Sequence, residues 1–369
     1  MLPMTRELNI KITGDASGIG RKSTVYILGA GCSSKYGYPL AKEFVTHLES
    51  FGKTLGEGAQ RLKKCVSETV ELMQRAGVHT VDDLAARLHD GNFVTRSGVP
   101  ARDLQFREER IREAKLVTSA MFLSKEGQAN RLGLSSYHDL LREMCVGPGN
   151  WQQRLRSSKS RVLSFNYDRL FETATLNLIG DLAEQGIYSS SLLNSGFDVF
   201  GDNISFEPQG FSFLKLHGSV GARVGYEHGQ QRYYAPMDGL FRPGADIEIT
   251  DSLFFDDQPN QLRYSPLLVY PHEKHHVEAG GKHEAYEKYL KSVWKKAEEI
   301  LLEADEIYLI GYSFAAIDRN SVLNLLGKAR KCRKFVVQNL PDQAKSICAR
   351  LAIKYPEIKA EWVPFGEQF

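Results

Sequence analysis

The chain has 369 residues, of which 42% are hydrophobic, and this is enough apolar material for one large domain or two smaller ones. Its 47 basic and 45 acidic residues leave a formal net charge of +2, which gives no general attraction to nucleic acid or to an anionic membrane. No apolar run approaches the roughly 18 residues of a membrane span. Residues 1–22, expected to form an N-terminal arm, lack the apolar core of a signal peptide, so we expect a soluble, cytoplasmic protein.

The first element predicted along the chain is a strand over residues 24–28. This run is apolar and β-branched without alternation, as in a strand that is buried on both faces. Gly29-Ala30-Gly31 ends the strand abruptly, and from Pro39 onward apolar residues recur at helical spacing. The sequence therefore predicts a strand, a glycine loop and then a helix.

Residues 52–155 are charged and carry helical periodicity, which predicts a helical insert beside a sheet. Further strand signals and one amphipathic helix follow, and they lie at residues 161–165, 211–216, 266–270, 284–302 (the helix), 306–310 and 334–337. Residues 221–265 are rich in Gly, Asp, Tyr and Pro and predict a long irregular excursion. The pattern predicts an α/β fold over residues 23–366, with a Rossmann-like parallel sheet and helices on both faces.

Polar clusters follow five of the predicted strands at their carboxyl ends, where open parallel sheets bind ligands. They are Gly29-Ala30-Gly31-Cys32-Ser33, Asn166-Tyr167-Asp168, His217-Gly218-Ser219, Gly311-Tyr312-Ser313 with Asp318, and Gln338-Asn339. Glycines allow a backbone to approach a phosphate, a helix N-terminus adds positive charge, and histidine is a natural general base near neutral pH.

Each cluster also has an ordinary structural interpretation. The glycines can form a tight turn, and Asp168 can make an Asx turn or cap the helix that begins near Leu170. His217 can be a structural histidine, and Asp318 can cap a helix that begins near Arg319. Their common position after strands nevertheless favours one shared ligand site.

The five clusters, in this order, resemble the SIR2 superfamily over roughly residues 24 to 345. The resemblance implies an NAD-binding domain in which Gly29, Ala30, Gly31 and Ser33 contact the pyrophosphate. It further implies that Asn166 and His217 are catalytic. The remaining residues implied to contact NAD are Asp168, Gly311, Ser313 and Asn339.

The sequence departs from the protein-deacylase sirtuins in ways that put peptide binding in doubt. Those enzymes carry two cysteine pairs of a zinc module, whereas this chain has no cysteine between Cys145 and Cys332. Leu40-Ala41-Lys42 replaces their Asp-Phe-Arg, and residues 52–155 have no obvious counterpart. The pattern is closer to bacterial SIR2-like NADases of anti-phage defence, which deplete NAD⁺.

The resemblance therefore implies hydrolysis of NAD⁺ at the nicotinamide–ribose bond. In this hypothesis His217 activates water, Asn166 orients the water and the ribose, and Asp168 holds the nicotinamide carboxamide or favours the developing positive charge. Ser313 and Asn339 hold the adenosine end. The same site is also compatible with an NAD-dependent deacylase, an ADP-ribosyltransferase or a non-catalytic module that senses NAD or ADP-ribose.

No metal site is expected. The five cysteines contain no C-x-x-C pair and predict reduced thiols, mostly in the core. A histidine-rich stretch lies in a Gly-rich, polar segment without cysteine, and its members are His272, His275, His276 and His283.

A constitutively active NADase would kill its host, so the hypothesis requires control of its activity. We expect a homo-oligomer, a partner protein in trans, or both. In SIR2-like defence families such partners include HerA-type ATPases and short Argonautes. The helical insert over residues 52–155 is the expected assembly surface, and neither a membrane nor a direct nucleic-acid partner is indicated.

Overall fold

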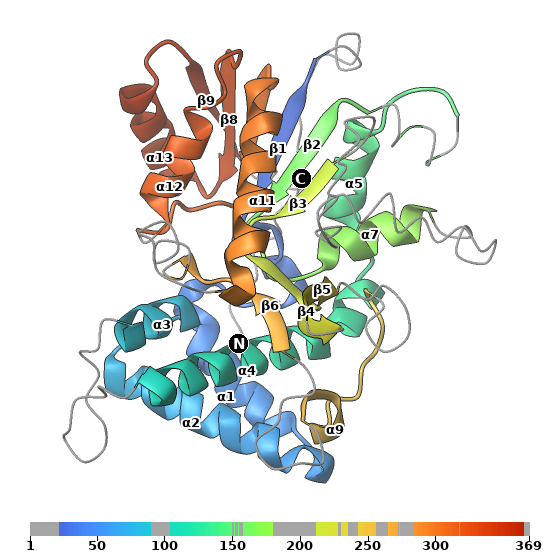
Figure 1. Cartoon of the computed structure of the whole chain (residues 1–369). Helices are drawn as coiled ribbons and strands as arrows, with labels where there is room; N and C mark the ends of the chain where they lie inside the picture. Colours follow the sequence, from blue (N-terminus) through green and yellow to red (C-terminus); the bar gives the residue numbers. More distant parts are fainter. Residues whose placement is uncertain are drawn as a thin grey trace. The chain divides into compact units, whose positions relative to one another are not determined.

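The computed structural model describes residues 22–89, 104–149, 151, 154, 158–179, 212–227, 230–234, 243–255, 265–271, 273, 284–316 and 318–364 (Figure 1). The chain divides into two compact units. The sheet unit, as we call it, comprises Met1–Gly37, Ala129–His217 and Lys288–Phe369. The insert unit comprises Tyr38–Gln128 and Gly218–Glu287.

The sheet unit contains a six-stranded parallel sheet with strand order β3-β2-β1-β7-β8-β9. Its strands are β1 (Thr24–Leu28), β2 (Ser160–Ser164), β3 (Ser212–Lys215), β7 (Glu306–Ile310), β8 (Lys334–Asn339) and β9 (Lys359–Pro364). Counted in chain order, this is the 3-2-1-4-5-6 arrangement of doubly wound dinucleotide-binding sheets. The observed sheet confirms the predicted α/β fold class.

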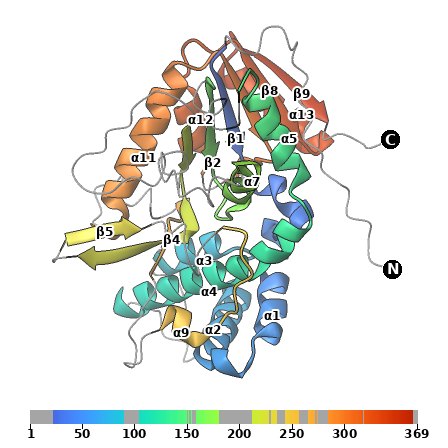
Figure 2. The ribbon, with the colours of Figure 1, turned by 90° about the vertical axis from the view of Figure 1, so that its right-hand side faces the viewer.

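Helices cover the sheet, and the central strand β1 is therefore buried along its whole length, as its unalternating apolar run predicts. These helices are α5 (Ser135–Met144), α7 (Leu170–Ile179), α11 (Glu284–Leu302), α12 (Arg319–Leu326) and α13 (Pro341–Lys354). Figure 2 shows α11 on one side of the sheet and α5 on the other.

The strands of the sheet end at one level. Leu28 of β1 is in register with Ser164 of β2 and with Ile310 of β7. Ser164 pairs in turn with Lys215 of β3, and Ile310 pairs with Gln338 of β8. The five polar clusters therefore begin at the same edge of the sheet, and the reversal of strand order between β1 and β7 falls in the middle of that edge.

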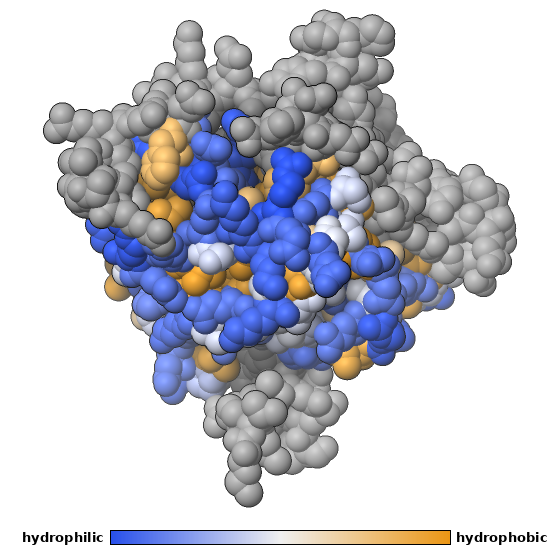
Figure 3. All heavy atoms as spheres, turned by 90° about the horizontal axis from the view of Figure 1, so that it is seen from below, coloured by the Kyte–Doolittle hydropathy of each residue, from blue (hydrophilic) through white to orange (hydrophobic). Residues whose placement is uncertain are grey.

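The insert unit is built from helices and a small antiparallel sheet. Its main helices are α1 (Phe44–Thr54), α2 (Gln60–Ala76), α3 (Val81–His89) and most of α4 (Leu104–Arg131). The described part of residues 52–155 is mostly helical, although α5 belongs to the sheet unit. The described residues on the face in Figure 3 are mostly hydrophilic, as expected of amphipathic helices that bury one side.

One strand prediction is wrong, and one region predicted to be irregular contains regular strands. Residues 266–270 were expected in the parallel sheet, but β6 (Ser265–Leu268) pairs antiparallel with β4 (Gly218–Glu227), which also pairs with β5 (Gln230–Tyr234). The excursion predicted over residues 221–265 therefore begins with regular strands and also contains the short helix α9 (Asp251–Phe254). A short buried apolar run does not reveal which sheet it joins, and the glycines of β4 conceal its strand character.

The helix predicted to follow the glycine loop is also wrong in detail. The loop continues into two single 3₁₀ turns, Ala30–Cys32 and Ser34–Tyr36, and Gly37 then adopts a left-handed φ of +85°. A third turn, Ala41–Glu43, precedes α1, which begins only at Phe44 in the insert unit. No long helix therefore begins directly after β1, so the glycine loop lacks the helix dipole that could attract an anion at this edge.

A buried ion pair beneath the sheet edge yields a stability prediction. Lys215 Nζ of β3 lies 3.4 Å from Glu172 Oε1 of α7, and both side chains are almost fully buried. Burial raises the pKa of Glu172, while the charge of Lys215 opposes the rise. We expect Lys215→Met to cost about 3–5 kcal/mol at neutral pH, because it leaves a buried carboxylate without its cation.

The deficit of Lys215→Met should shrink as pH falls. Folding raises the pKa of Glu172, so its protonated form contributes stability at low pH, and this contribution is lost as pH rises through the pKa of the folded protein. Urea unfolding at several pH values measures the deficit. The matched control is Lys331→Met, which breaks the exposed Lys331–Glu303 pair and should cost less than about 1 kcal/mol. Equal losses in the two variants would contradict the prediction.

Candidate functional site

The glycine loop after β1 touches the loop after β7 through backbone atoms. Gly29 N donates to Ile310 O at 2.9 Å, and Gly31 N donates to Gly311 O at 3.0 Å. A Cβ placed on Gly29 would lie 2.5 Å from Tyr312 Cα, and one on Gly31 would lie 2.9 Å from Gly311 Cα. These glycines are therefore required for the two loops to meet at the reversal of strand order.

The amides of the glycine loop are largely used within the fold. Besides Gly29 and Gly31, Cys32 N donates to Gly29 O, and Ser33 N donates to Ala30 O. The predicted phosphate cradle of loop amides is thus already hydrogen-bonded within the protein at these positions. Ala30 itself is exposed at the rim of the loop.

A buried polar network centred on Ser33 anchors the loop. Ser33 Oγ donates to Asp168 Oδ2 at 2.7 Å, so its hydroxyl accepts from Tyr137 OH at 2.8 Å. Asn166 Nδ2 lies within hydrogen-bond distance of both Gly29 O, at 3.1 Å, and Ser33 Oγ, at 3.3 Å. Burial and the nearby Asp168 carboxylate raise the pKa of Tyr137 well above its usual value, which keeps its phenol protonated.

Both the side chain and the backbone carbonyl of Asp168 accept hydrogen bonds from the sheet unit. Its Oδ1 accepts from Leu170 N at 3.1 Å at the start of α7, in agreement with the Asx-turn interpretation. Its backbone carbonyl accepts from the buried Lys215 Nζ. Together with Ser33, these contacts hold the carboxylate inside the sheet unit.

His217 lies at the carboxyl end of β3 in an aromatic environment, and the residue is only 6% exposed. Its ring and that of Phe165 are nearly perpendicular at a centroid distance of 5.1 Å, and the rings of Tyr167 and Trp294 lie 6.2 and 6.5 Å away. Trp294 Nε1 of α11 donates to Leu216 O at 3.2 Å. The turn that carries the imidazole is thereby fixed from α11.

Asp318 does not cap α12 as the sequence suggested. It occupies the N-cap position, but its side chain makes no capping hydrogen bond. Its Oδ2 instead lies 3.3 Å from His217 Nε2 and accepts from Tyr312 OH, also at 3.3 Å. Burial, with the Asp318 carboxylate, raises the pKa of Tyr312 well above its usual value. The sequence offered one signal for this pairing, an acidic residue shortly after the fourth cluster.

The clusters after β7 and β8 contain both buried and exposed residues. Asn339 Nδ2 donates to Tyr312 O, and Asn339 Oδ1 accepts from Leu340 N, both at 2.9 Å. Asn339 therefore holds the loop after β7, whereas Ser313 on that loop is exposed.

The segment Phe165–Tyr167 connects two groups of predicted site residues. Phe165 and Tyr167 contact the His217 ring, while Asn166 between them binds the glycine loop. The structure thus joins Asn166 with Ser33 and Asp168 in one group, and His217 with Asp318 in another. Neighbouring positions on one short segment link these groups.

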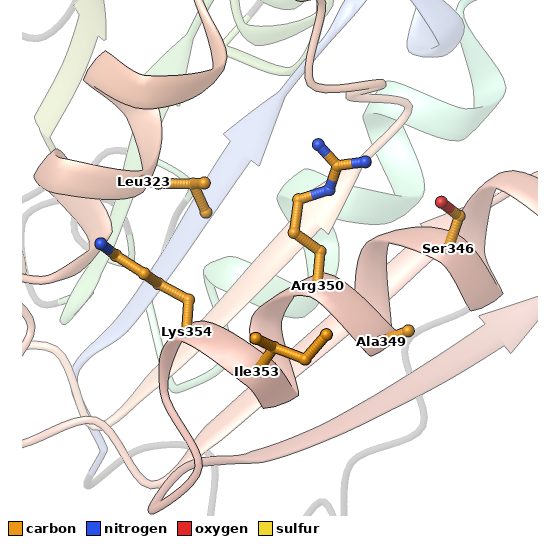
Figure 4. A pocket seen from close by; sticks show the side chains of 6 residues that line it. All are labelled: Leu323, Ser346, Ala349, Arg350, Ile353 and Lys354. Atoms are coloured by element: carbon orange, nitrogen blue, oxygen red, sulfur yellow. The ribbon is translucent and has the colours of Figure 1, made fainter.

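Among the described residues, no group of three or more His, Cys, Asp or Glu side chains is placed to hold a metal ion. The stretch containing His272, His275, His276 and His283 lies outside the described residues. Within the same described ranges, no helix is both long and apolar enough to cross a membrane. An open hollow of about 480 Å³ between α12 and α13 contains none of the five clusters (Figure 4).

No family model matches the chain, and no curated protein matches it at a significant level. Among solved structures, it is similar to one reported as "Structural Basis for the Mechanism and Regulation of Sir2 Enzymes". The match covers 88% of this chain and 84% of that chain, with 14% sequence identity and a TM-score of 0.34. A likeness this slight leaves the functional argument to the geometry of the sheet edge.

The contact between the loops predicts that Gly29→Ala destabilises the protein. The added Cβ would force the backbones of Gly29 and Tyr312 apart, and overpacking of this kind costs about 1–3 kcal/mol or more. The control is Gly56→Ala, where no atom lies within 4 Å of the new Cβ and φ is −77°. Urea unfolding of both variants measures the difference, and an equally stable Gly29→Ala protein would contradict the close contact.

The structure also predicts that Cys32 is a poor nucleophile. Its Sγ donates to Ile310 O at 3.0 Å, and burial raises the pKa of its thiol to about 12. Iodoacetamide at pH 8 should therefore label the partly exposed Cys348 well before Cys32. Peptide mass spectrometry follows the two sites, and unfolding in urea should abolish the protection of Cys32.

Proposed function

We propose that this chain binds NAD⁺ across the carboxyl edge of its parallel sheet and hydrolyses the nicotinamide–ribose bond. The observation that carries the proposal is that a buried imidazole, His217, and a buried amide, Asn166, belong to two groups at this edge that the segment Phe165–Tyr167 links. The coarser part of the proposal, a dinucleotide site, is supported by the strand order, because ligands of such sheets bind where that order reverses.

The residues of the edge divide into a frame and a contact surface in this proposal. Ser33, Asp168 and Asn339 belong to the frame, because their polar atoms hold the two central loops. Gly29 and Gly31 allow those loops to meet, because a Cβ on either glycine would collide with the backbone of the loop after β7. Ala30, Gly311 and Ser313 supply the contact surface of the dinucleotide, and Ala30 and Ser313 are exposed.

The reaction needs one base and good positioning. The bond between ribose C1′ and the nicotinamide nitrogen breaks with its electron pair passing to that nitrogen, so nicotinamide leaves as a neutral molecule. A water oxygen forms the new bond to C1′, and His217 accepts the proton that this water loses. Asn166 orients the water and the ribose, and the products are nicotinamide, ADP-ribose and one proton.

Control of such an activity is part of the proposal. Depletion of NAD⁺ would be toxic to the host, so we propose a gated effector of anti-phage defence that acts as a homo-oligomer or with a partner protein. The helices of the insert unit are the proposed assembly surface, because α2 and α3 turn charged residues to solvent.

The test is turnover of NAD⁺ by purified protein, followed as release of nicotinamide. His217→Ala and Asn166→Ala should each lower kcat by about 10²–10⁴-fold while circular dichroism stays unchanged. The matched control is His138→Ala, which removes a half-buried imidazole from α5 and should leave turnover intact. Full activity of His217→Ala would remove the base from this mechanism.

The wild-type protein also distinguishes the other NAD-dependent activities. Release of O-acyl-ADP-ribose from an acetylated peptide would indicate deacylation, and modified protein would indicate ADP-ribosyl transfer. Tight binding of NAD⁺ or ADP-ribose without any turnover, measured by calorimetry, would indicate a sensing module. We expect free ADP-ribose in an equimolar amount with nicotinamide.

A further inference from the structure

We propose that Asp318 is a positioning residue that selects the tautomer and orientation of His217, and that Tyr312 holds Asp318 in place. This inference rests on the proposed function for its kinetic consequence, but its structural part concerns this chain alone. It adds to the site the carboxylate of Asp318 and the phenol of Tyr312, which both follow β7. In the sheet, β7 lies on the opposite side of β1 from β3, the strand that precedes His217.

The charge of Asp318 favours one position for the proton on the His217 ring. Asp318 Oδ2 lies 3.3 Å from His217 Nε2, a buried nitrogen that makes no hydrogen bond to a described residue, so the two groups interact through charge. An ionised carboxylate only accepts hydrogen bonds, so a neutral imidazole in this position is favoured when its proton is on Nε2. The lone pair then lies on Nδ1, and Nδ1 is the nitrogen that can accept a proton from water.

Burial strengthens this selection. Asp318 is 2% exposed and His217 is 6% exposed, so water competes little with their interaction. The aromatic rings of Phe165 and Trp294 border the imidazole, which limits its rotation. A carboxylate that orients a histidine base is a known device for holding the productive tautomer.

Tyr312 links this pair to the frame of the sheet edge. Its hydroxyl donates to the same Asp318 oxygen that faces His217, and its carbonyl accepts from Asn339. The raised pKa of Tyr312 keeps the phenol protonated as a donor over the physiological range. The order Asn339, Tyr312, Asp318 and His217 thus runs from the end of β8 to the proposed base. The absence of a capping bond from Asp318 to α12 agrees with a carboxylate held for this purpose.

The experiment measures the tautomer directly. Nitrogen-15 spectra of protein labelled in its 10 histidines report which ring nitrogen is protonated, and His217→Gln assigns the relevant signal. We expect the Nε2–H form in the wild-type protein and a shift toward the Nδ1–H form in Asp318→Asn. The control Asp342→Asn makes the same change at an exposed position in the first turn of α13 and should leave the signal unchanged.

Kinetics supply the second readout. Asp318→Asn should lower kcat for NAD⁺ hydrolysis by about 10²–10⁴-fold with KM within about twofold, because it disturbs the base and not the binding surface. Asp318→Glu should recover part of the loss, and Tyr312→Phe should lose less than Asp318→Asn. The two milder variants keep the test decisive if Asp318→Asn folds poorly.

The outcomes separate this inference from the proposed function. A wild-type Nδ1–H tautomer, or an unchanged tautomer in folded Asp318→Asn, would overturn the role of Asp318. An unchanged kcat in folded Asp318→Asn would overturn its kinetic part. A wild-type protein that shows the expected tautomer but no turnover of NAD⁺ would instead refute the proposed hydrolysis while supporting the positioning contact.

Discussion

Backbone contact between the loops after β1 and β7 is the constraint on which the sheet edge depends. Gly29 and Gly31 come so close to Gly311 and Tyr312 that no side chain fits between them. This contact places the glycine loop where Asn166 and Ser33 can bind it, and it places Tyr312 where Asn339 can hold it. Both groups of proposed site residues are therefore attached to the same backbone junction.

The polar side chains around this junction are buried, which is costly unless each has a partner. On one side Ser33 hydrogen-bonds both Asp168 and Asn166, and on the other Asp318 accepts from Tyr312 and lies 3.3 Å from His217 Nε2. Such networks define a single arrangement, because breaking one contact leaves polar atoms inside a medium of low dielectric. In the proposed reaction, a base held in one orientation by such a network needs no reorganisation.

Much of the sheet could be predicted from the sequence because buried parallel strands have an unmistakable composition. The runs at residues 24–28, 161–165, 211–216, 306–310 and 334–337 all correspond to strands of the parallel sheet. β9 was not predicted, because Lys359 and Glu361 give this edge strand a polar appearance. The run at residues 266–270 was assigned to the wrong sheet, since apolarity records burial and not the identity of the neighbouring strand.

By itself, the sequence determined that the five clusters follow strands, and hence that they share one edge, because this depends only on local order along the chain. It did not determine what each polar atom touches. Only the tertiary structure decided that Ser33 and Asp168 bind each other, and that Asp318 turns from its helix toward His217. These partners lie 135 and 101 residues apart in the chain, and contacts over such separations depend on the packing of strands that no local pattern encodes.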